Sequence, residues 1–157
     1  MARATRATAM LDKAGVPFTV ESYSYDRDAD HIGLQAAEAL SQPPERVLKT
    51  LMALVDGRPA IAIVPSDREV AMKALAAALG GKAAQMMKPA DAERLSGYKV
   101  GGISPFGQPR RLPVVIEQTA LAQPFVYING GQRGLQIRLA PADALRLLDA
   151  VAAPIVG

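Results

Sequence analysis

The segment from Val47 to Pro65 constrains the fold of this chain more than any other stretch of its 157 residues. Two apolar runs, VLKTLMALV and PAIAIV, lie on either side of Asp56-Gly57. Asp-Gly between two strand-like runs is a strong hairpin signal, because both residues tolerate the positive φ angles of a tight turn. The sequence therefore predicts a long β-hairpin whose two faces are both mostly apolar.

Helix and strand signals are interspersed along the rest of the chain, and several strands are joined by short turns. This pattern favours one mixed α/β domain, residues 1–157, with a largely antiparallel sheet. Ser66 and Glu69 have capping-box spacing ahead of the third helix. Helices are expected at Arg3–Ala14, Ile32–Leu40, Val70–Leu79, Pro89–Gly97 and Pro141–Ala152. Further strands are expected at Pro17–Tyr25, Ala83–Met87, Leu112–Thr119, Phe125–Asn129 and Leu135–Leu139.

Composition narrows the class of protein. The chain has no cysteine, which leaves no disulfide, thiolate metal site or cysteine nucleophile. Its apolar runs are shorter than the roughly 18 residues of a membrane helix, and its N-terminus is too polar for a signal peptide. We therefore expect a cytoplasmic protein without a membrane partner. DNA is not expected as a partner either.

The charges are unevenly distributed, although the net charge is only +3. Residues 1–45 carry a net charge of −3, whereas residues 82–111 carry six basic against two acidic residues. A basic surface attracts polyanions such as nucleic acid, but a solvated face without a partner has the same pattern.

Most catalytic and cofactor-binding motifs are absent from the sequence. His31 is the sole histidine, and Ser104 lacks the glycine that a nucleophile elbow needs two positions later. The phosphate-binding and dinucleotide-binding glycine motifs do not occur, and DRDADH fails as a calcium loop. One histidine without cysteine also leaves no convincing transition-metal site. We expect catalysis without metal or cofactor, through lysine, hydroxyls, backbone amides or the substrate's own groups.

Lys49 is the most informative single residue, because it interrupts the first apolar run of the hairpin. Alternation along a strand would place Lys49 on one face with Val47 and Leu51. One interpretation is a strand-end lysine whose ammonium group reaches water along an apolar surface. The other is a lysine inside a pocket, which implies a polar ligand because an unpaired buried ammonium group is costly.

Two glycine-rich segments are candidate loops for ligand binding. In YKVGGISPFG, residues 98–107, Gly101-Gly102 would let backbone N–H groups approach a carbonyl oxygen or phosphate closely. A tight bend without a ligand explains the same pattern. In YINGGQRG, residues 127–134, Gly130-Gly131 first indicates a hairpin turn. The turn would join a site only if its tip lies beside the first loop.

The combination of these segments is more specific than any one of them. VLKT (47–50), GYKVGGISPFG (97–107) and INGGQRGLQI (128–137) resemble, in this order and spacing, the YbaK/EbsC family. This family comprises free-standing relatives of the editing domain inserted in bacterial prolyl-tRNA synthetases. PFTVESYSYD (17–26) and HIG (31–33) extend the resemblance to nearly the whole chain.

The resemblance implies a fold and an activity. The fold would be a curved, largely antiparallel sheet surrounded by helices. The activity would be trans-editing, in which misacylated Cys-tRNA(Pro) is deacylated, with the substrate's own thiol attacking its ester carbonyl. Partners would be the acceptor end of tRNA(Pro) and, in a transient complex, prolyl-tRNA synthetase.

The resemblance also assigns roles to residues. Lys49 matches the essential lysine, which would position and polarise the aminoacyl ester, and amides near Gly102 would bind the ester carbonyl. Ile32 stands where other members carry phenylalanine, which implies a different pocket width. The implied substrate-binding positions are Tyr23, His31, Ile32, Gly101, Gly102, Ser104, Pro105, Gly130 and Gly131. The basic segment would contact tRNA phosphates weakly through Lys88, Lys99, Arg110 and Arg111.

Two alternatives remain open at the level of sequence. The protein could deacylate another aminoacyl-tRNA, such as one carrying alanine or serine. It could also be a non-catalytic tRNA-binding or regulatory module, in which case Lys49 would be dispensable and the glycines would serve shape alone.

Overall fold

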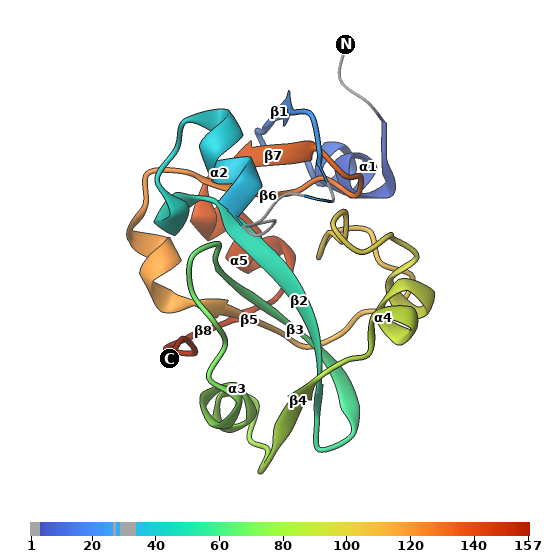
Figure 1. Ribbon diagram of the computed structural model, residues 1–157, viewed down its shortest axis with the longest axis vertical. Coiled ribbons are helices and arrows are strands. Elements are labelled where there is room, and N and C mark those ends of the chain that lie inside the picture. The colour runs from blue at the N-terminus through green and yellow to red at the C-terminus, as the bar shows by residue number, and fades with distance from the viewer. Residues whose placement is uncertain (1–3, 27, 29–33) are drawn as a thin grey trace.

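The computed structural model describes residues 4–26, 28 and 34–157 (Figure 1). The predicted hairpin is present: β2 (Leu48–Val55) pairs antiparallel with β3 (Arg58–Pro65) along its whole length. Asp56 and Gly57 form the turn with φ angles of 50° and 80°. Positive φ at both central residues is the requirement of a type I′ turn, which matches the twist of the two strands.

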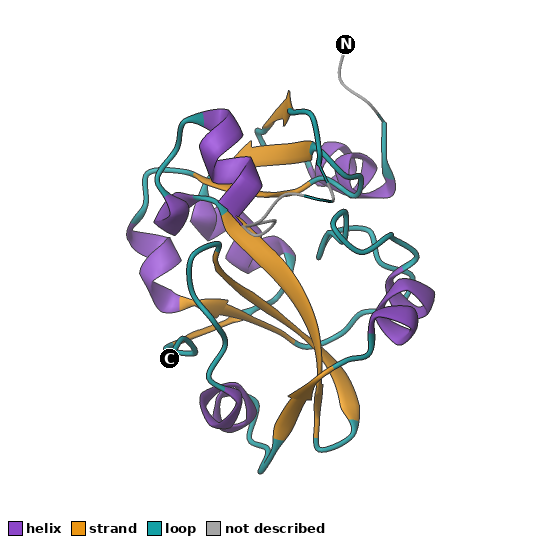
Figure 2. Cartoon of the chain, viewed as in Figure 1, coloured by secondary structure: helices purple, strands orange, loops and turns teal. Residues whose placement is uncertain are grey.

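The hairpin lies inside a five-stranded sheet with the order β4-β2-β3-β5-β8 (Figure 2). β4 (Ala84–Met86) is antiparallel to β2, whereas β5 (Val114–Glu117) and β8 (Val151–Ala153) extend the sheet in parallel. A three-stranded antiparallel sheet with the order β1-β7-β6 crosses one end of β2 (Figure 1). Its strands are β1 (Thr19–Ser22), β6 (Val126–Asn129) and β7 (Leu135–Leu139). The predicted mixed α/β fold with largely antiparallel pairing is confirmed.

Both faces of the hairpin are buried, which explains why its strands are almost continuously apolar. Ile61 and Ile63 of β3 pack into the main core between the two sheets, which α1 (Arg6–Ala14) and α5 (Pro141–Leu147) complete. Ala62 and Val64 point the other way, into a second cluster that α3 (Met72–Ala78) covers. The strict alternation follows from the two-residue period of a strand.

Several predicted helix boundaries agree with the capping residues. α1 begins after Thr5, which forms a capping box with Thr8, and ends at Gly15 in the left-handed conformation. α4 (Pro89–Ser96) has proline in its first turn and ends at left-handed Gly97. The remaining helices are α2 (Gln35–Leu40) and the short 3-10 helices η2 (Pro44–Arg46) and η3 (Gln118–Ala122).

The expected capping box ahead of α3 is wrong. Ala71 precedes the helix and makes no side-chain capping bond. Ser66 is instead buried, and its hydroxyl donates to the Pro44 carbonyl at 3.3 Å. Sequence spacing identifies a possible capping residue. Because the Ser66 hydroxyl bonds to a carbonyl elsewhere in the fold, it does not cap α3.

The expected closing helix is too long. α5 ends at Leu147, Asp149 has a φ angle of 50°, and residues 151–153 form β8 beside β5. Glu117, at the end of β5, stabilises the segment that follows β8. Its buried carboxylate accepts hydrogen bonds from the backbone N–H groups of Ile155 and Val156 at 2.8 and 3.3 Å. Burial raises the pKa of this carboxyl, but the backbone N–H donors outweigh burial and leave its pKa below the usual value.

Candidate active site

A cavity of about 310 Å³ opens beside the start of β2. Five consecutive β2 residues line it, Leu48–Met52, although a cavity on one face of a strand would meet only alternate residues. The reason is an open strand edge. β4 pairs with β2 only from Ala53 to Val55, and the isolated Val47–Tyr127 bridge lies at the other end. Between them, the described chain sets no strand against this edge of β2.

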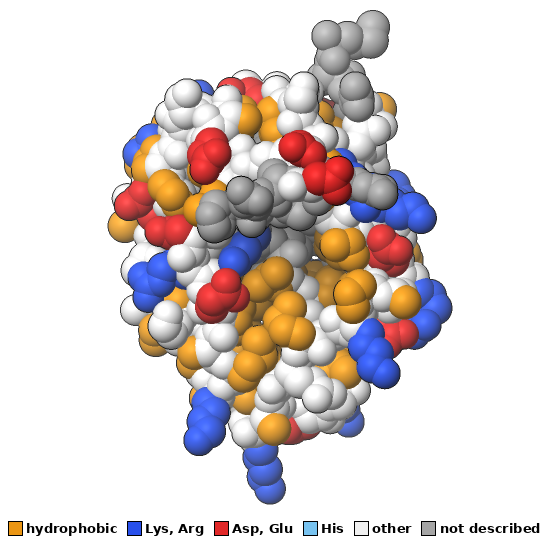
Figure 3. All heavy atoms as spheres, in the orientation of Figure 1, with side chains coloured by type: hydrophobic (Ala, Val, Ile, Leu, Met, Phe, Trp, Pro, Cys, Tyr) orange, Lys and Arg blue, Asp and Glu red, His pale blue; other side chains and the backbone are white. Residues whose placement is uncertain are grey.

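The cavity is apolar over most of its lining and lies in a hollow of the surface. Figure 3 shows hydrophobic side chains gathered in the middle of this face, with charged side chains around them. Its lining includes Met52, Met86 and Met87, three of the six methionines of the chain. Methionine is flexible and polarisable, so this wall adapts to a small apolar or sulfur-containing group.

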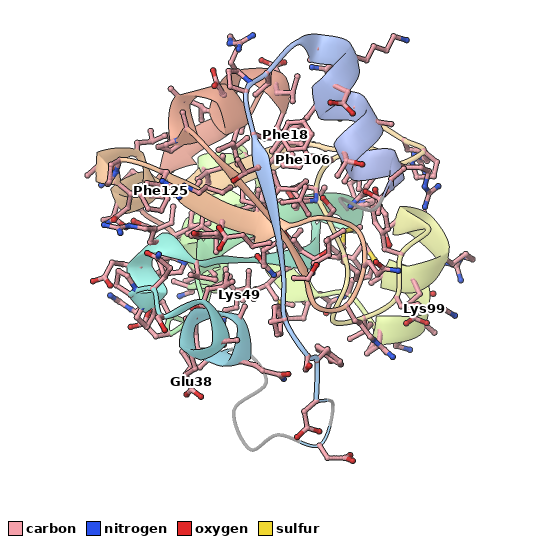
Figure 4. All side chains as sticks on the ribbon, turned by 90° about the horizontal axis from the view of Figure 1, so that it is seen from above. Phe18, Glu38, Lys49, Lys99, Phe106 and Phe125 are labelled. Carbon is pink, nitrogen blue, oxygen red and sulfur yellow. The ribbon has the colours of Figure 1, made fainter. Side chains whose placement is uncertain are left out.

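Lys49 lines the cavity and still reaches water, so it combines features of the pocket lysine and of the strand-end lysine. Its side chain is 23% exposed, and Figure 4 shows it well inside the outline of the molecule, in contrast to Lys99 at the edge. Its Nζ lies 3.7 Å from Oε1 of Glu69, whose side chain is 90% exposed. A solvent-exposed partner at this distance binds weakly. The ammonium group is therefore held at the cavity and can exchange its partner for a ligand.

Two polar atoms in the cavity-lining residues lack hydrogen-bond partners. Thr50 Oγ1 and Gln136 Oε1 are both buried and unpaired among the described residues. Buried polar atoms are nearly always hydrogen-bonded, so each unpaired atom calls for an explanation. A ligand that brings hydrogen-bond donors into the cavity would supply one.

Tyr23 adds a neutral hydroxyl to the same wall. Burial raises the pKa of its phenol, the nearby Tyr25 raises it further, and the N–H donor of the Gln136 side-chain amide, whose oxygen stays unpaired, lowers it in part. The net increase in pKa keeps Tyr23 protonated at physiological pH. It can therefore donate a proton in a hydrogen bond but is not a general base.

The two glycine-rich loops meet at the cavity, which is the condition under which the second loop joins a site. Asn129 lines the cavity and connects the loops: its Nδ2 donates to Gly101 O at 3.3 Å, and its Oδ1 accepts from Gly131 N at 2.7 Å. A Cβ atom on Gly102 would lie only 2.7 Å from the backbone N of Arg133. Glycine at 102 is therefore required for the close approach of the two backbones.

Among the amides near Gly102 that were expected to bind an ester carbonyl, the amide of Gly102 itself is already engaged. Gly102 N donates to Lys99 O at 2.8 Å, so this N–H already has a partner. Gly130 is similarly engaged: its N–H donates to Leu135 O, and its carbonyl accepts from the hydroxyl of Thr5 at 2.6 Å. Both glycines are buried, and they contribute to the shape of the loops without lining the cavity.

Ser104 and Pro105 do not line the first cavity, although the preceding Ile103 does. Ser104 is fully buried, and its hydroxyl accepts from Phe106 N at 3.1 Å, which stabilises the turn. Pro105 lines a second cavity of about 270 Å³, together with Arg110 and Arg111. The predicted basic contacts therefore fall into two groups. Lys88 and Lys99 are exposed and precede Pro89 and Val100 of the first cavity, whereas the two arginines belong to the second.

His31 and Ile32 lie outside the described residues. Within the described ranges, no group of three His, Asp or Glu side chains is arranged to hold a metal ion. The helices in this part of the chain are all too short or too polar to cross a membrane.

Sequence reasoning missed several residues that line the cavity, among them Thr50, Gln136, Asn129 and Tyr25. Thr50 follows Lys49 directly, and its hydroxyl in an apolar strand was an available signal. Gln136 similarly interrupts the apolar run LQIRL. Asn129 and Tyr25 gave no separate signal, since asparagine before glycine is ordinary turn chemistry and a tyrosine after a strand is common.

Comparisons with known proteins point to one family. A family model described as an aminoacyl-tRNA editing domain matches residues 28–147. The chain is 32% identical over 145 residues to EbsC of Enterococcus faecalis, named as a proposed Cys-tRNA(Pro)/Cys-tRNA(Cys) deacylase, over 91% of this chain and 87% of that protein. It is 25% identical over 144 residues to the Escherichia coli multifunctional Ser/Thr-tRNA deacylase ProXp-y, over 90% and 86% of the two chains.

A solved structure agrees with the fold. A protein described as a proposed trans-editing enzyme for prolyl tRNA synthetase superposes with a TM-score of 0.82 at 20% identity, and the match covers 99% of each chain. At this identity the similarity establishes the architecture of the chain and nothing finer.

Proposed function

This chain belongs to the aminoacyl-tRNA editing domain family, and on that premise we propose that it is a trans-editing deacylase whose preferred substrate is Cys-tRNA(Pro). As an aminoacyl-tRNA deacylase it is a hydrolase of the ester that joins an amino acid to tRNA. One observation carries the proposal: Lys49, Tyr23 and Gly101, from three separate segments, line one small cavity, and two other residues of its lining carry unpaired polar atoms.

The cavity suits an aminoacyl group. Its volume of about 310 Å³ lies at the lower end of the roughly 300–1,000 Å³ range of small-molecule sites. The α-ammonium group of any aminoacyl ester brings three N–H donors. Thr50 Oγ1 and Gln136 Oε1 are acceptors without partners in residues that line the cavity, and either could accept one of these N–H groups.

The cavity wall favours a thiol over a hydroxyl in the amino-acid side chain. Around the methionines, a serine hydroxyl would lose its hydrogen bonds to water, which is costly without replacement. A thiol is a weak donor and tolerates the same surroundings better. This argument is the physical reason for naming cysteine as the preferred side chain.

The proposed reaction uses the substrate's own nucleophile. The cysteine sulfur attacks its ester carbonyl carbon, a C–S bond forms, the bond from that carbon to the ribose oxygen breaks, and the thiol proton ends on the ribose oxygen. The resulting thiolactone is hydrolysed by water. Holding sulfur and carbonyl together supplies much of the acceleration, because the reacting groups are already part of one molecule.

Lys49 would position and polarise the ester in this reaction. Its ammonium group is held at the cavity by a weak, exposed partner, Glu69. A carbonyl or ribose oxygen with growing negative charge would be a better partner in the partly dehydrated cavity. No separate base is required.

A second candidate is deacylation of seryl- or threonyl-tRNA, and the unpaired atoms favour it as well. Thr50 Oγ1 or Gln136 Oε1 could accept the hydroxyl of a seryl group in place of the ammonium group. The similarity to ProXp-y points the same way. Thr50→Val separates the two, because it removes the hydroxyl with little change of shape: it should reduce serine release selectively only if Thr50 binds the side-chain hydroxyl.

The proposed macromolecular partners follow from the substrate. Lys88 and Lys99 are exposed beside residues that line the cavity, where they can meet phosphates of the acceptor end of tRNA(Pro). A transient complex with prolyl-tRNA synthetase would deliver the mischarged tRNA, and tRNA charging would place the protein in the cytoplasm.

The test is deacylation of tRNA(Pro) carrying cysteine, alanine, serine or threonine. Wild-type protein, Lys49→Ala, Lys49→Arg and the control Lys73→Ala, an exposed lysine on α3, should be compared. We expect rapid release of cysteine, no release of alanine, a loss of about 100-fold in Lys49→Ala and wild-type rates in Lys73→Ala.

The other outcomes are informative. Release of alanine would mean that water is the nucleophile, which rejects the thiol mechanism and leaves the deacylase assignment intact. If the wild type released no amino acid, even with prolyl-tRNA synthetase added, the non-catalytic tRNA-binding module would become the better description.

A further inference from the structure

The mouth of the first cavity carries an unusual group of exposed side chains. Val100 is 41% exposed and Met86 is 45% exposed, and both line the cavity. Together with Val151 they are the large hydrophobic residues that the described chain leaves most open to water. Single exposed apolar residues need no explanation, but two at the mouth of one cavity suggest that a bound group covers them.

An aromatic ring and an arginine lie at the same mouth. Tyr25 lines the cavity, is part-exposed, and packs so closely on Gly101 that an added Cβ would approach the phenol oxygen within 2.5 Å. The guanidinium carbon of Arg133 lies 5.5 Å from the Tyr25 ring centroid. Arg133 Nε also donates to Val100 O at 2.8 Å, which fixes the arginine over the ring.

We propose that Tyr25 and Arg133 form a stacking platform for the nucleobase of the 3′-terminal nucleotide of tRNA, an inference that rests on the proposed deacylase function. An ester bound at Lys49 is joined directly to the ribose of that nucleotide, so its base must lie at the cavity mouth. Aromatic rings and guanidinium planes are the groups that bind unpaired bases, by stacking and cation–π contact.

The platform would position the substrate without contributing to the bond changes. Tyr25 and Arg133 come from segments far apart in sequence, and each contacts the loop that carries Gly101. A base stacked on them would fix the ribose, and through it the ester carbonyl, relative to Lys49. Stacking of one base is worth about a tenfold change in affinity.

The experiment uses uncharged tRNA(Pro) in which 2-aminopurine replaces the terminal adenine. The fluorescence of this base falls when it stacks on an aromatic ring, and a dye at the 5′ end reports binding of the whole tRNA separately. Tyr25→Phe keeps the ring and should keep the fall in fluorescence. Tyr25→Leu keeps much of the volume but should abolish the fall, while tRNA affinity decreases about tenfold.

Further arms check the position and the source of the base. Arg133→Met, which keeps an unbranched apolar side chain but removes the guanidinium group, should weaken the fall. 2-Aminopurine within the acceptor stem should show none. Adenosine monophosphate should restore the fluorescence only at concentrations far above those of tRNA, because it lacks the phosphate contacts of the chain.

Each result decides a different question. If Tyr25→Leu binds tRNA and still lowers the fluorescence as the wild type does, the platform is refuted. If wild-type protein deacylates Cys-tRNA(Pro) but leaves the terminal base unstacked, the platform is refuted and the proposed function stands. If the protein neither binds nor deacylates tRNA, both fail. Tighter binding of free nucleotide than of tRNA would refute the tRNA end as the source of the base.

Discussion

Replacement of Gly102 by alanine tests whether the contact between the two loops shapes the active site. The added methyl group would lie 2.7 Å from Arg133 N and 2.8 Å from the carbonyl carbon of Gln132. Ordinary contact begins at 3.4 Å, so the backbones must separate by at least ~0.7 Å. Both obstacles are backbone atoms and cannot rotate away. Overpacking of this kind costs about 2 kcal/mol of folding free energy.

Gly102→Ala should also lower activity. Gly101 and Asn129, on either side of this contact, both line the cavity. A displacement of roughly 1 Å in groups that position a substrate can lower the rate by about 100-fold. We therefore expect Gly102→Ala to lower kcat/KM for Cys-tRNA(Pro) by a factor of 10 to 100, on the order of the effects that positioning has elsewhere.

Gly80→Ala is the matched control. Gly80 has a φ angle of 74° and no atom within 4 Å of an added Cβ, so alanine there is strained but does not clash. It follows α3, which does not line the cavity, and should cost about 1–2 kcal/mol of stability with unchanged kcat/KM. Urea unfolding and deacylation rates measure the two quantities. Wild-type kcat/KM in Gly102→Ala, or an equal loss in both variants, would refute the reasoning.

Three other predictions concern charge and polarity. Because the folded-state pKa of Glu117 is lowered, its ionised form contributes stability that is complete above the unfolded-state pKa of about 4.3 and is lost as pH falls through the folded-state pKa. Urea unfolding between pH 7 and pH 3 should therefore show a smaller acid loss in Glu117→Gln than in the wild type; equal slopes would contradict this. Replacing Lys88 and Lys99 together by serine should reduce by about two the slope of log affinity for tRNA against log salt concentration, and an unchanged slope would place the phosphates elsewhere. Asn129→Ala should lower deacylation with a melting temperature reduced by several degrees, since it removes the bonds to Gly101 and Gly131; full activity would show that these bonds do not shape the cavity.

Much of the fold could be predicted from local chemistry. The hairpin at Asp56-Gly57 and the start and end of α4 at Pro89 and Gly97 follow from turn and capping preferences that act within a few residues. The position of Lys49 in an apolar strand marked it as either a strand-end lysine or a pocket lysine, and the sequence left both interpretations open. The two glycine-rich loops were recognisable from their sequence alone, because the backbone conformations that glycine permits are a local property.

Other features required the tertiary structure. Ser66 was expected to cap a helix, but its hydroxyl donates to the Pro44 carbonyl. Residues 151–153 were expected in a helix, but they form a strand that pairs with β5. The amides near Gly102 were expected to face a ligand, and that of Gly102 itself donates to the Lys99 carbonyl. In each case a local preference was outweighed by a partner that the sequence pattern does not show.

The same distinction between local chemistry and tertiary structure applies to the candidate active site. The sequence by itself singled out Lys49 and the paired glycines as candidate site residues, because a lysine in an apolar strand and paired glycines in a loop conflict with their surroundings and so stand out. Only the tertiary structure decided that β4 leaves the edge of β2 open beside Lys49 and that Gly102 touches the backbone of Arg133. The physical reason is that strand pairing and loop contact depend on competition among segments far apart in the chain, which no local pattern records.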